Sequence, residues 1–105
     1  MEIKSLIAKA HETAKSKGFW ETPSPKSEKI ALMHSELSEM LEAVRDPTNP
    51  PDRHCPKFSN EIIELADLVI RAADYAGGYG LPLAEAIEAK MAYNASRPHR
   101  HGKTF

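Results

Sequence analysis

The sequence predicts an all-α fold, and three observations support this. Apolar residues recur at helical spacing over four separate stretches of the 105-residue chain. Most prolines and glycines fall at the boundaries of those stretches. Valine, isoleucine and threonine do not form the alternating runs that indicate strands. We therefore expect one helical domain spanning residues 1–105, folded as a four-to-five-helix bundle.

The first helix is expected over about residues 2–17, where apolar residues recur every three or four positions. Gly18 should end it. The proline-rich linker that follows contains Trp20, the only tryptophan. Ser24 is expected to cap the second helix, with Pro25 at its first helical position.

The second helix is expected to continue to about Arg45, because residues 46–47 read Asp-Pro and a loop rich in proline follows. Ser59 is the expected N-cap of the third helix. The glycine pair at 77–78 is expected to end that helix. Together these two helices carry the longest apolar stripes of the chain.

The fourth helix is expected to begin after Gly80, with Pro82 near its first turn. It should end by Arg97, since Pro98 disfavours the helical conformation of the residue before it. Residues 98–105 then form a short basic tail.

Composition excludes several classes of partner and location. The formal net charge is -1, with 14 basic and 15 acidic residues, so no overall field favours nucleic acid or an anionic membrane. No apolar run approaches the roughly 20 residues of a membrane span. The N-terminus lacks the apolar stretch of a signal peptide, and the single cysteine, Cys55, fits a reducing compartment. We expect a cytoplasmic protein that binds neither nucleic acid nor membrane.

Two matched pairs of carboxylates are the most informative motif. Glu36 and Glu39 lie in the second predicted helix, and Glu64 and Asp67 lie in the third. Each pair is spaced i, i+3, which places its two acids on neighbouring positions of one helix surface. If the two helices pack together, all four carboxylates could converge on a hard divalent cation such as Mg²⁺. Such a site suggests chemistry on a phosphate.

The alternative interpretation of these acids is a solvated helix face. In that case Asp67 would pair with Arg71 at i, i+4, and the other acids would be surface residues. Two features count against it. Glu36 and Glu39 have no basic residue four positions away, and apolar residues such as Leu32 flank the pair. The residue pattern alone leaves both interpretations open.

The order of the acids resembles a known signature. Glu36-x-x-Glu39, then 24 intervening residues, then Glu64-x-x-Asp67 resembles the motif of the MazG-like all-alpha nucleoside triphosphate pyrophosphohydrolase family. The segment 90–103 also resembles the end of small MazG-like proteins, where a lysine, an asparagine and an arginine recur at this spacing. The resemblance covers most of the chain, but no base-recognition signature can be carried over.

The resemblance implies a role for each acid. Family members use Mg²⁺, for which Mn²⁺ could substitute, to cleave a nucleoside triphosphate between the α and β phosphates. The products are a nucleoside monophosphate and pyrophosphate, and a role in nucleotide pool cleaning would fit this activity. By resemblance, Glu36, Glu39, Glu64 and Asp67 are metal ligands. One of the catalytic residues Glu36 and Glu39 would also hold the attacking water as general base.

The resemblance also suggests substrate-binding residues. Lys90, Asn94 and Arg97 recur about one turn apart on the fourth helix and could contact phosphates, and Lys103 could reach a site from the tail. For Lys90, a solvated surface lysine is the competing interpretation. Trp20 could stack on a base, or it could anchor the core.

The resemblance further implies assembly as a homodimer or homotetramer, which the small expected core makes reasonable. Two other functions remain open. One is a phosphoribosyl-ATP pyrophosphohydrolase-like enzyme, which uses similar acids. The other is a non-catalytic helical module for protein interaction or nucleotide binding, in which the acids are surface residues.

Overall fold

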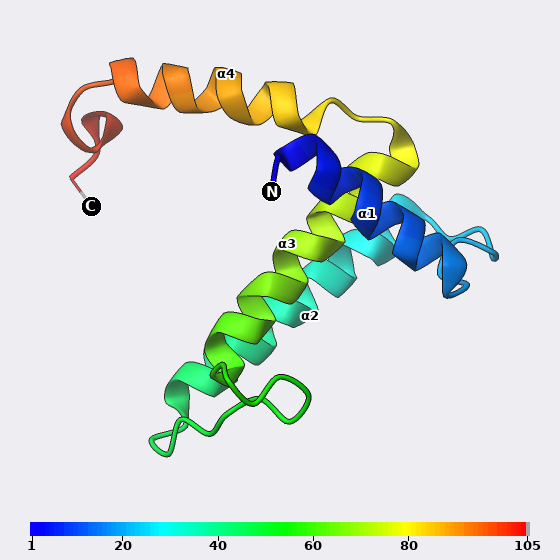
Figure 1. The fold of residues 1–105 in the computed structure, drawn as a ribbon. Coiled ribbons are helices and arrows are strands. Elements are labelled where there is room, and N and C mark those ends of the chain that lie inside the picture. The colour runs from blue at the N-terminus through cyan, green and yellow to red at the C-terminus, as the bar shows by residue number, and fades with distance from the viewer. Residues whose placement is uncertain (105) are drawn as a thin grey trace.

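The computed structural model describes residues 1–104, and within this range it contains helices and no strands. The four α-helices are α1 (Ile3–Ser16), α2 (Lys26–Arg45), α3 (Asn60–Tyr79) and α4 (Leu83–Ser96), and a short 3₁₀-helix, η1 (His99–Gly102), follows them (Figure 1). The predicted all-α class is therefore confirmed.

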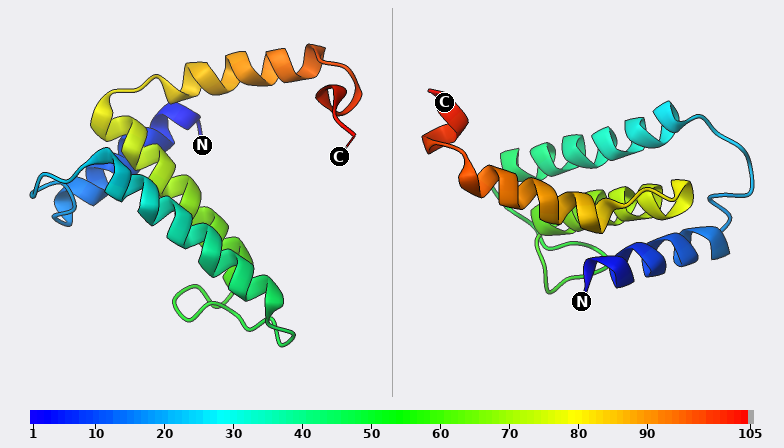
Figure 2. Two further views of the ribbon diagram at one scale, coloured as in Figure 1. Left: turned by 180° about the vertical axis from the view of Figure 1, so that it is seen from behind. Right: turned by 90° about the horizontal axis from the view of Figure 1, so that it is seen from above.

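Helix α3 is the centre of the helical bundle. Helix α2 lies antiparallel alongside it, and α1 packs against α3 near the end that leads to α4 (Figures 1 and 2). Helix α4 leaves the end of α3 and projects away from the other three helices. An ion pair between Lys4 and Glu85, 3.6 Å apart, joins the beginnings of α1 and α4.

The N-termini of α2 and α3 differ in how they are capped. The predicted cap of α3 is confirmed, because the Ser59 hydroxyl accepts a hydrogen bond from the Ile62 backbone N–H at 3.5 Å. The predicted Ser24 cap of α2 is wrong. Pro25 is extended, with φ −68° and ψ 153°, so the helix begins one residue later and Pro25 itself occupies the cap position.

The predicted end of α3 at Gly77 and Gly78 is also wrong, because the helix continues to Tyr79 and ends at Gly80. Gly80 has a φ of 64°, the left-handed conformation that closes many helices. The two earlier glycines permit close packing instead. A Cβ at Gly77 would lie 2.8 Å from the His11 Cβ, and one at Gly78 would overlap the Trp20 indole.

The core of this single chain is small. The buried apolar residues of the described chain are all alanines: Ala10, Ala73, Ala76 and Ala84. No large side chain in residues 1–104 is fully buried. Large apolar side chains on α2 and α3 are instead partly exposed. At helical spacing, Ile30, Leu37, Leu41 and Val44 form a stripe on α2, and Ile62, Leu65 and Val69 form one on α3.

None of the helices in the described chain combines the length and the apolar character that a membrane crossing requires.

Candidate metal centre and adjoining cavity

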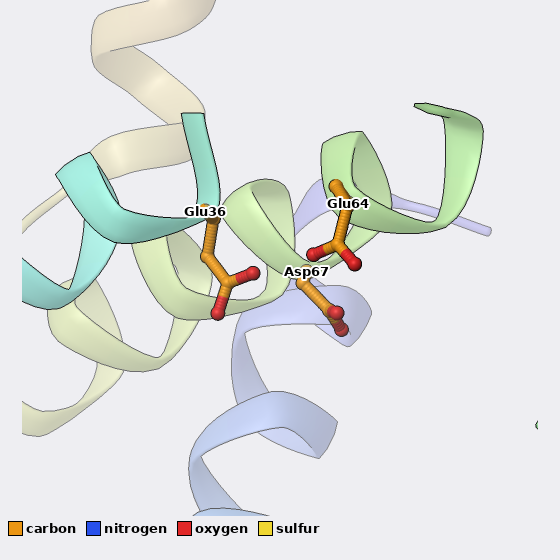
Figure 3. A group of neighbouring side chains, drawn as sticks. All are labelled: Glu36, Glu64 and Asp67. Atoms are coloured by element: carbon orange, nitrogen blue, oxygen red, sulfur yellow. The ribbon is translucent and has the colours of Figure 1, made fainter. Parts of the chain in front are cut away.

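Three of the four predicted acids meet between α2 and α3. Glu64 and Asp67 lie one turn apart on α3, and Glu36 faces them from α2 (Figure 3). One carboxylate oxygen from each residue lies within 4.8 Å of the others. The i, i+3 spacing places the α3 pair on one face, and the antiparallel packing of α2 brings Glu36 to it.

Glu39 lies at the edge of this group and is exposed. It is not among the three residues whose oxygens converge. Its side chain nevertheless approaches Glu64 closely enough to interact with that carboxyl group. Glu39 thus adjoins the group formed by Glu36, Glu64 and Asp67, which we call the acidic cluster.

Two oxygens of the acidic cluster are buried and have no hydrogen-bond partner, namely Glu36 Oε2 and Glu64 Oε2. Glu36 is only 6% exposed. A buried polar atom without a partner costs roughly 1–3 kcal/mol, so such atoms usually indicate a missing ligand, ion or water. Carboxylate oxygens are the ligands that Mg²⁺ prefers. The donor set and its unpaired oxygens therefore fit a hard divalent cation.

The carboxyl groups of the acidic cluster have different proton affinities. Burial raises the pKa of Glu64, and the neighbouring carboxyl groups of Glu39 and Glu36 raise it further, to about 8. Burial and the charge of Glu36 also raise the pKa of Asp67. For Glu36, burial is opposed by hydrogen bonds and by the charge of Arg71, so its pKa falls below the ordinary value. The cluster thus combines a carboxylate with a protonated acid near neutral pH.

Arg71 is the positively charged residue that contacts the acidic cluster. Its Nε donates a hydrogen bond to Glu36 Oε1 at 2.8 Å, from α3 across to α2. The local Asp67–Arg71 ion pair of the solvated-face interpretation is not formed, because Arg71 pairs with Glu36 on the other helix. Glu36 therefore has a counter-ion, although none lies near it in sequence.

A cavity of about 510 Å³ adjoins the acidic cluster and lies among α1, α2 and α3. Glu36, Asp67 and Arg71 contribute to its lining. Three lysines also line it: Lys9, Lys17 and Lys29. The remaining wall is largely apolar and includes Leu6, Phe19, Leu32 and Ile70. The cavity thus combines an acidic end that fits a cation with basic groups that fit an anion and with apolar surface.

Trp20 is positioned as an anchor between α1 and α3. Its Nε1 donates a hydrogen bond to Asp74 Oδ1 at 2.9 Å, and His11 Nδ1 lies 3.0 Å from the same oxygen. The indole forms T-shaped ring contacts with His11 and Tyr79. Trp20 is not among the residues that line the cavity, whereas its neighbour Phe19 is. Of the two roles considered for Trp20 from the sequence, these contacts match the anchor in the core and not a surface for stacking on a base.

The predicted substrate-binding residues of the C-terminal region lie on or beyond α4. None of Lys90, Asn94, Arg97 and Lys103 lines the cavity, because α4 projects away from the helices that carry the acids (Figure 1). Lys90 and Arg97 both lie over the ring of Tyr93, at 4.8 Å and 5.3 Å from its centroid. Within one chain the structure does not bring these residues to the acidic cluster.

Arg71 and Asp74 were not identified as site residues from the sequence. A signal was present, since Arg71 and Asp74 follow Glu64 and Asp67 at intervals of three and four residues. That spacing continues the acidic face of α3 toward the cavity. Lys29 was missed as well, and it lies 3.9 Å from the centroid of the Trp20 ring.

Scans of the chain against protein-family models, curated proteins and solved structures found no match. What the site can do is therefore inferred from its own geometry and chemistry.

Proposed function

We propose that this protein is a cytoplasmic, Mg²⁺-dependent nucleoside triphosphate pyrophosphohydrolase of the MazG-like all-alpha type. It would hydrolyse the bond between the α and β phosphates and release a nucleoside monophosphate and pyrophosphate. The observation that carries the proposal is the acidic cluster, in which Glu36, Glu64 and Asp67 converge from two helices. Two of their oxygens are buried without partners, and Glu36 and Asp67 line a cavity large enough for a ligand.

Glu36, Glu64 and Asp67 would hold the ion. When bound, Mg²⁺ would neutralise charge on the phosphates and lower the pKa of a bound water. Glu39 lies beside Glu64 but outside the converging group, so it is well placed to accept a proton from the attacking water. Mn²⁺ could replace Mg²⁺, because it also accepts carboxylate ligands.

The cavity supports a phosphorylated substrate that also has an apolar part. The lysines of its lining would contact phosphates, and Leu6, Phe19 and Leu32 would contact the less polar part of the ligand. A volume of about 510 Å³ lies within the range of roughly 300–1,000 Å³ that is typical of small-molecule sites. A nucleotide fits both requirements.

We also propose that the protein acts as a homodimer or homotetramer. The partly exposed stripes of α2 and α3 suit contact with a second copy, because the chain alone buries little apolar surface. Assembly would also give the basic residues of α4 a role. Lys90, Asn94, Arg97 and Lys103 cannot serve the cavity of their own chain in this arrangement, but they could contact substrate in the cavity of a partner.

Pyrophosphate release tests the proposal. Purified protein is incubated with a panel of ribo-, deoxyribo- and modified nucleoside triphosphates, with Mg²⁺ and again with excess chelator. We expect pyrophosphate and monophosphate in equal amounts with Mg²⁺, and none with chelator. Release of orthophosphate instead would contradict cleavage between the α and β phosphates.

Adding phosphoribosyl-ATP to this panel, and measuring the binding of nucleotide and of divalent cation to the same protein, separates the other functions. Turnover of phosphoribosyl-ATP and not of nucleoside triphosphates would indicate a phosphoribosyl-ATP pyrophosphohydrolase-like enzyme. Nucleotide binding without turnover in the presence of Mg²⁺ would indicate a non-catalytic nucleotide-binding module. If neither nucleotide nor divalent cation binds, the helical interaction module is favoured.

A further inference from the structure

Arg71 contacts Glu36, a carboxylate that would also bind a metal ion in the acidic cluster. Its guanidinium contacts Glu36 Oε1 at 2.8 Å, and Glu36 is one of the three residues whose oxygens converge. A divalent cation held by these three residues, for example through the unpaired Glu36 Oε2, would lie close to this positive charge. Like charges at such short separation repel strongly at a site that is partly shielded from water. The ion pair and the cation are therefore competitors for one carboxylate.

The Arg71 side chain has more room than its partner. It is 39% exposed, whereas the Glu36 side chain is 8% exposed, so a change of the ion pair would require the arginine to move less of its surroundings than the glutamate. Arg71 also lines the cavity, which gives its side chain space beyond Glu36. Only Nε is engaged with Glu36, which leaves the two terminal nitrogens of the guanidinium to bind another acceptor.

We propose that Arg71 is a resident counter-ion that a divalent cation displaces from Glu36, and that the displaced guanidinium then binds a phosphate group of the ligand in the cavity. The proposal rests on the function proposed above. Without a cation, Arg71 keeps the buried Glu36 carboxylate paired. With a cation present, the same positive charge becomes available to an anion, so cation and phosphate bind in that order.

Arg71 differs in this respect from the lysines of the cavity. A guanidinium can bind a phosphate through two parallel hydrogen bonds, whereas an ammonium acts as a point charge. Lys29 lies over the Trp20 ring, 3.9 Å from its centroid. Among the basic residues that line the cavity, Arg71 is the one that the structure pairs with a member of the acidic cluster.

The test uses two ligands separately. Mn²⁺ binding is measured by calorimetry without nucleotide, and pyrophosphate binding is measured at saturating Mg²⁺. We expect Arg71→Met to bind Mn²⁺ about tenfold more tightly than the natural chain, equivalent to about 1.4 kcal/mol, because the competing charge is gone. We expect the same variant to bind pyrophosphate about tenfold more weakly. A purely structural role for Arg71 predicts that both affinities fall.

Two variants serve as controls. Arg71→Lys keeps the charge, so its Mn²⁺ affinity should remain near that of the natural chain, while its pyrophosphate affinity should be intermediate. Arg45→Met removes an equal charge from the last turn of α2, and Arg45 does not line the cavity. It should change neither affinity.

Displacement can also be observed in the natural chain, which guards against a variant that does not fold. The Nε–H signal of Arg71, assigned by its loss in Arg71→Lys, should shift and exchange faster with water when Mg²⁺ saturates the site. If Mg²⁺ binds and this signal is unchanged, the inference is wrong. Equal or weaker Mn²⁺ binding by Arg71→Met would also overturn it.

The failure of this inference can be distinguished from failure of the proposed function. If the natural chain binds Mn²⁺ and Arg71→Met does not bind it more tightly, only the role of Arg71 is lost. If neither chain binds Mn²⁺, the proposed metal-dependent function and the role of Arg71 fail together.

Discussion

Glu36 and Glu64 belong to the same acidic cluster, yet their pKa values move in opposite directions. Arg71 lowers the pKa of Glu36 against the effect of burial, whereas burial and the neighbouring acids raise that of Glu64 to about 8. Near neutral pH the metal-free protein therefore keeps a proton on Glu64. A cation that binds there has to displace this proton, so binding should release it to solvent.

The raised pKa of Glu64 predicts how stability depends on pH. Its folded-state pKa of about 8 lies above the ordinary 4.5, so the native state binds the proton more tightly than the unfolded state. The stabilisation is present below pH 4.5 and is lost as the pH rises through 8. We expect the metal-free melting temperature to fall between pH 5 and pH 8.5, by roughly 4–8 °C per kcal/mol lost.

Glu64→Gln is the control for this pH dependence. It mimics the protonated side chain at every pH, so the melting temperature should vary much less across the same range. Mg²⁺ should stabilise the natural chain more at pH 8.5 than at pH 5, because it binds the ionised carboxylates. A melting temperature that rises from pH 5 to pH 8.5 without metal would contradict the pKa of Glu64.

Glu39 is the residue for which a role in turnover can be tested apart from folding. It is exposed and lies outside the converging oxygens, so Glu39→Gln should leave the melting temperature nearly unchanged. If it accepts the proton of the attacking water, kcat should fall about 100-fold or more. The measurement is steady-state pyrophosphate release, with Glu42→Gln, one turn further along α2, as the matched control. Near-normal turnover by Glu39→Gln would contradict the role.

From the sequence it was possible to predict that Glu36, Glu64 and Asp67 come together, but not that Glu39 lies outside their group or that Arg71 pairs with Glu36. Spacing of i, i+3 within a helix is a local property, so the pairing of Glu64 with Asp67 on one face could be predicted. The position of Glu36 opposite them depends on the register between α2 and α3. The ion pair between Arg71 and Glu36 depends on the same register, whereas local i, i+4 spacing predicts that Arg71 pairs with Asp67. These contacts depend on how the two helices pack, and the packing register cannot be predicted from the spacing of residues in a single sequence.

Helix α3 accommodates two glycines in its interior, which ordinarily destabilises a helix by about 1 kcal/mol each. Because of this cost, the sequence predicts a helix end at these two glycines. Their benefit is tertiary, because Gly77 lies against His11 and Gly78 lies against Trp20. Helix ends marked by local chemistry, such as the Ser59 cap, were predictable from sequence, whereas a glycine needed for close approach was not.

Gly78→Ala tests this close approach. Helix propensity alone predicts that alanine stabilises α3 by about 1 kcal/mol. Overlap of the new Cβ with the Trp20 ring should instead cost about 1–3 kcal/mol. We therefore expect a lower melting temperature together with a shift in the fluorescence of Trp20, the only tryptophan.

Gly80→Ala provides the comparison. A Cβ there meets no atom within 4 Å, but the residue has a φ of 64°, so alanine should cost about 1–2 kcal/mol through backbone strain alone. It should lower the melting temperature without changing the Trp20 emission. A Gly78→Ala protein that melts several degrees higher than the natural chain would exclude the tight packing.

In the molecule as a whole, the buried apolar residues that the structure describes are alanines, and the larger apolar side chains of α2 and α3 lie partly exposed on the surface. In the described chain, the buried apolar residues are small, while Leu37, Leu41 and Val69 are each about half exposed, at 46%, 50% and 46%. A second hollow of about 380 Å³ lies where α2 and α3 meet the start of α4, and its lining includes Ile30, Met33 and Ala76. These features fit a chain that completes its core by association.

We expect the natural chain to sediment as a dimer or tetramer at micromolar concentration. Leu41→Lys combined with Val69→Lys should shift it to monomer, because two charges would have to be desolvated in the interface. The melting temperature should then fall and lose its dependence on protein concentration. Analytical ultracentrifugation and thermal melts over a hundredfold range of concentration measure both effects.

Phe58→Lys is the matched control for the association experiment. Phe58 is 54% exposed but lies in the loop before α3 and not on the two apolar stripes. It should leave the oligomeric state unchanged. A natural chain that is monomeric and melts at one temperature at all concentrations would contradict assembly.

The cavity is bounded by two helix pairs, α2–α3 and α1–α3, which share helix α3. Helices α2 and α3 hold the acidic cluster, whereas α1 packs chiefly on α3 and closes the other side of the cavity. A small outward tilt of α1 would widen the entrance without separating Glu36 from Glu64 and Asp67. The rate at which a ligand enters or leaves and the strength with which a cation is held can consequently change independently, one through the α1–α3 contact and the other through the α2–α3 contact.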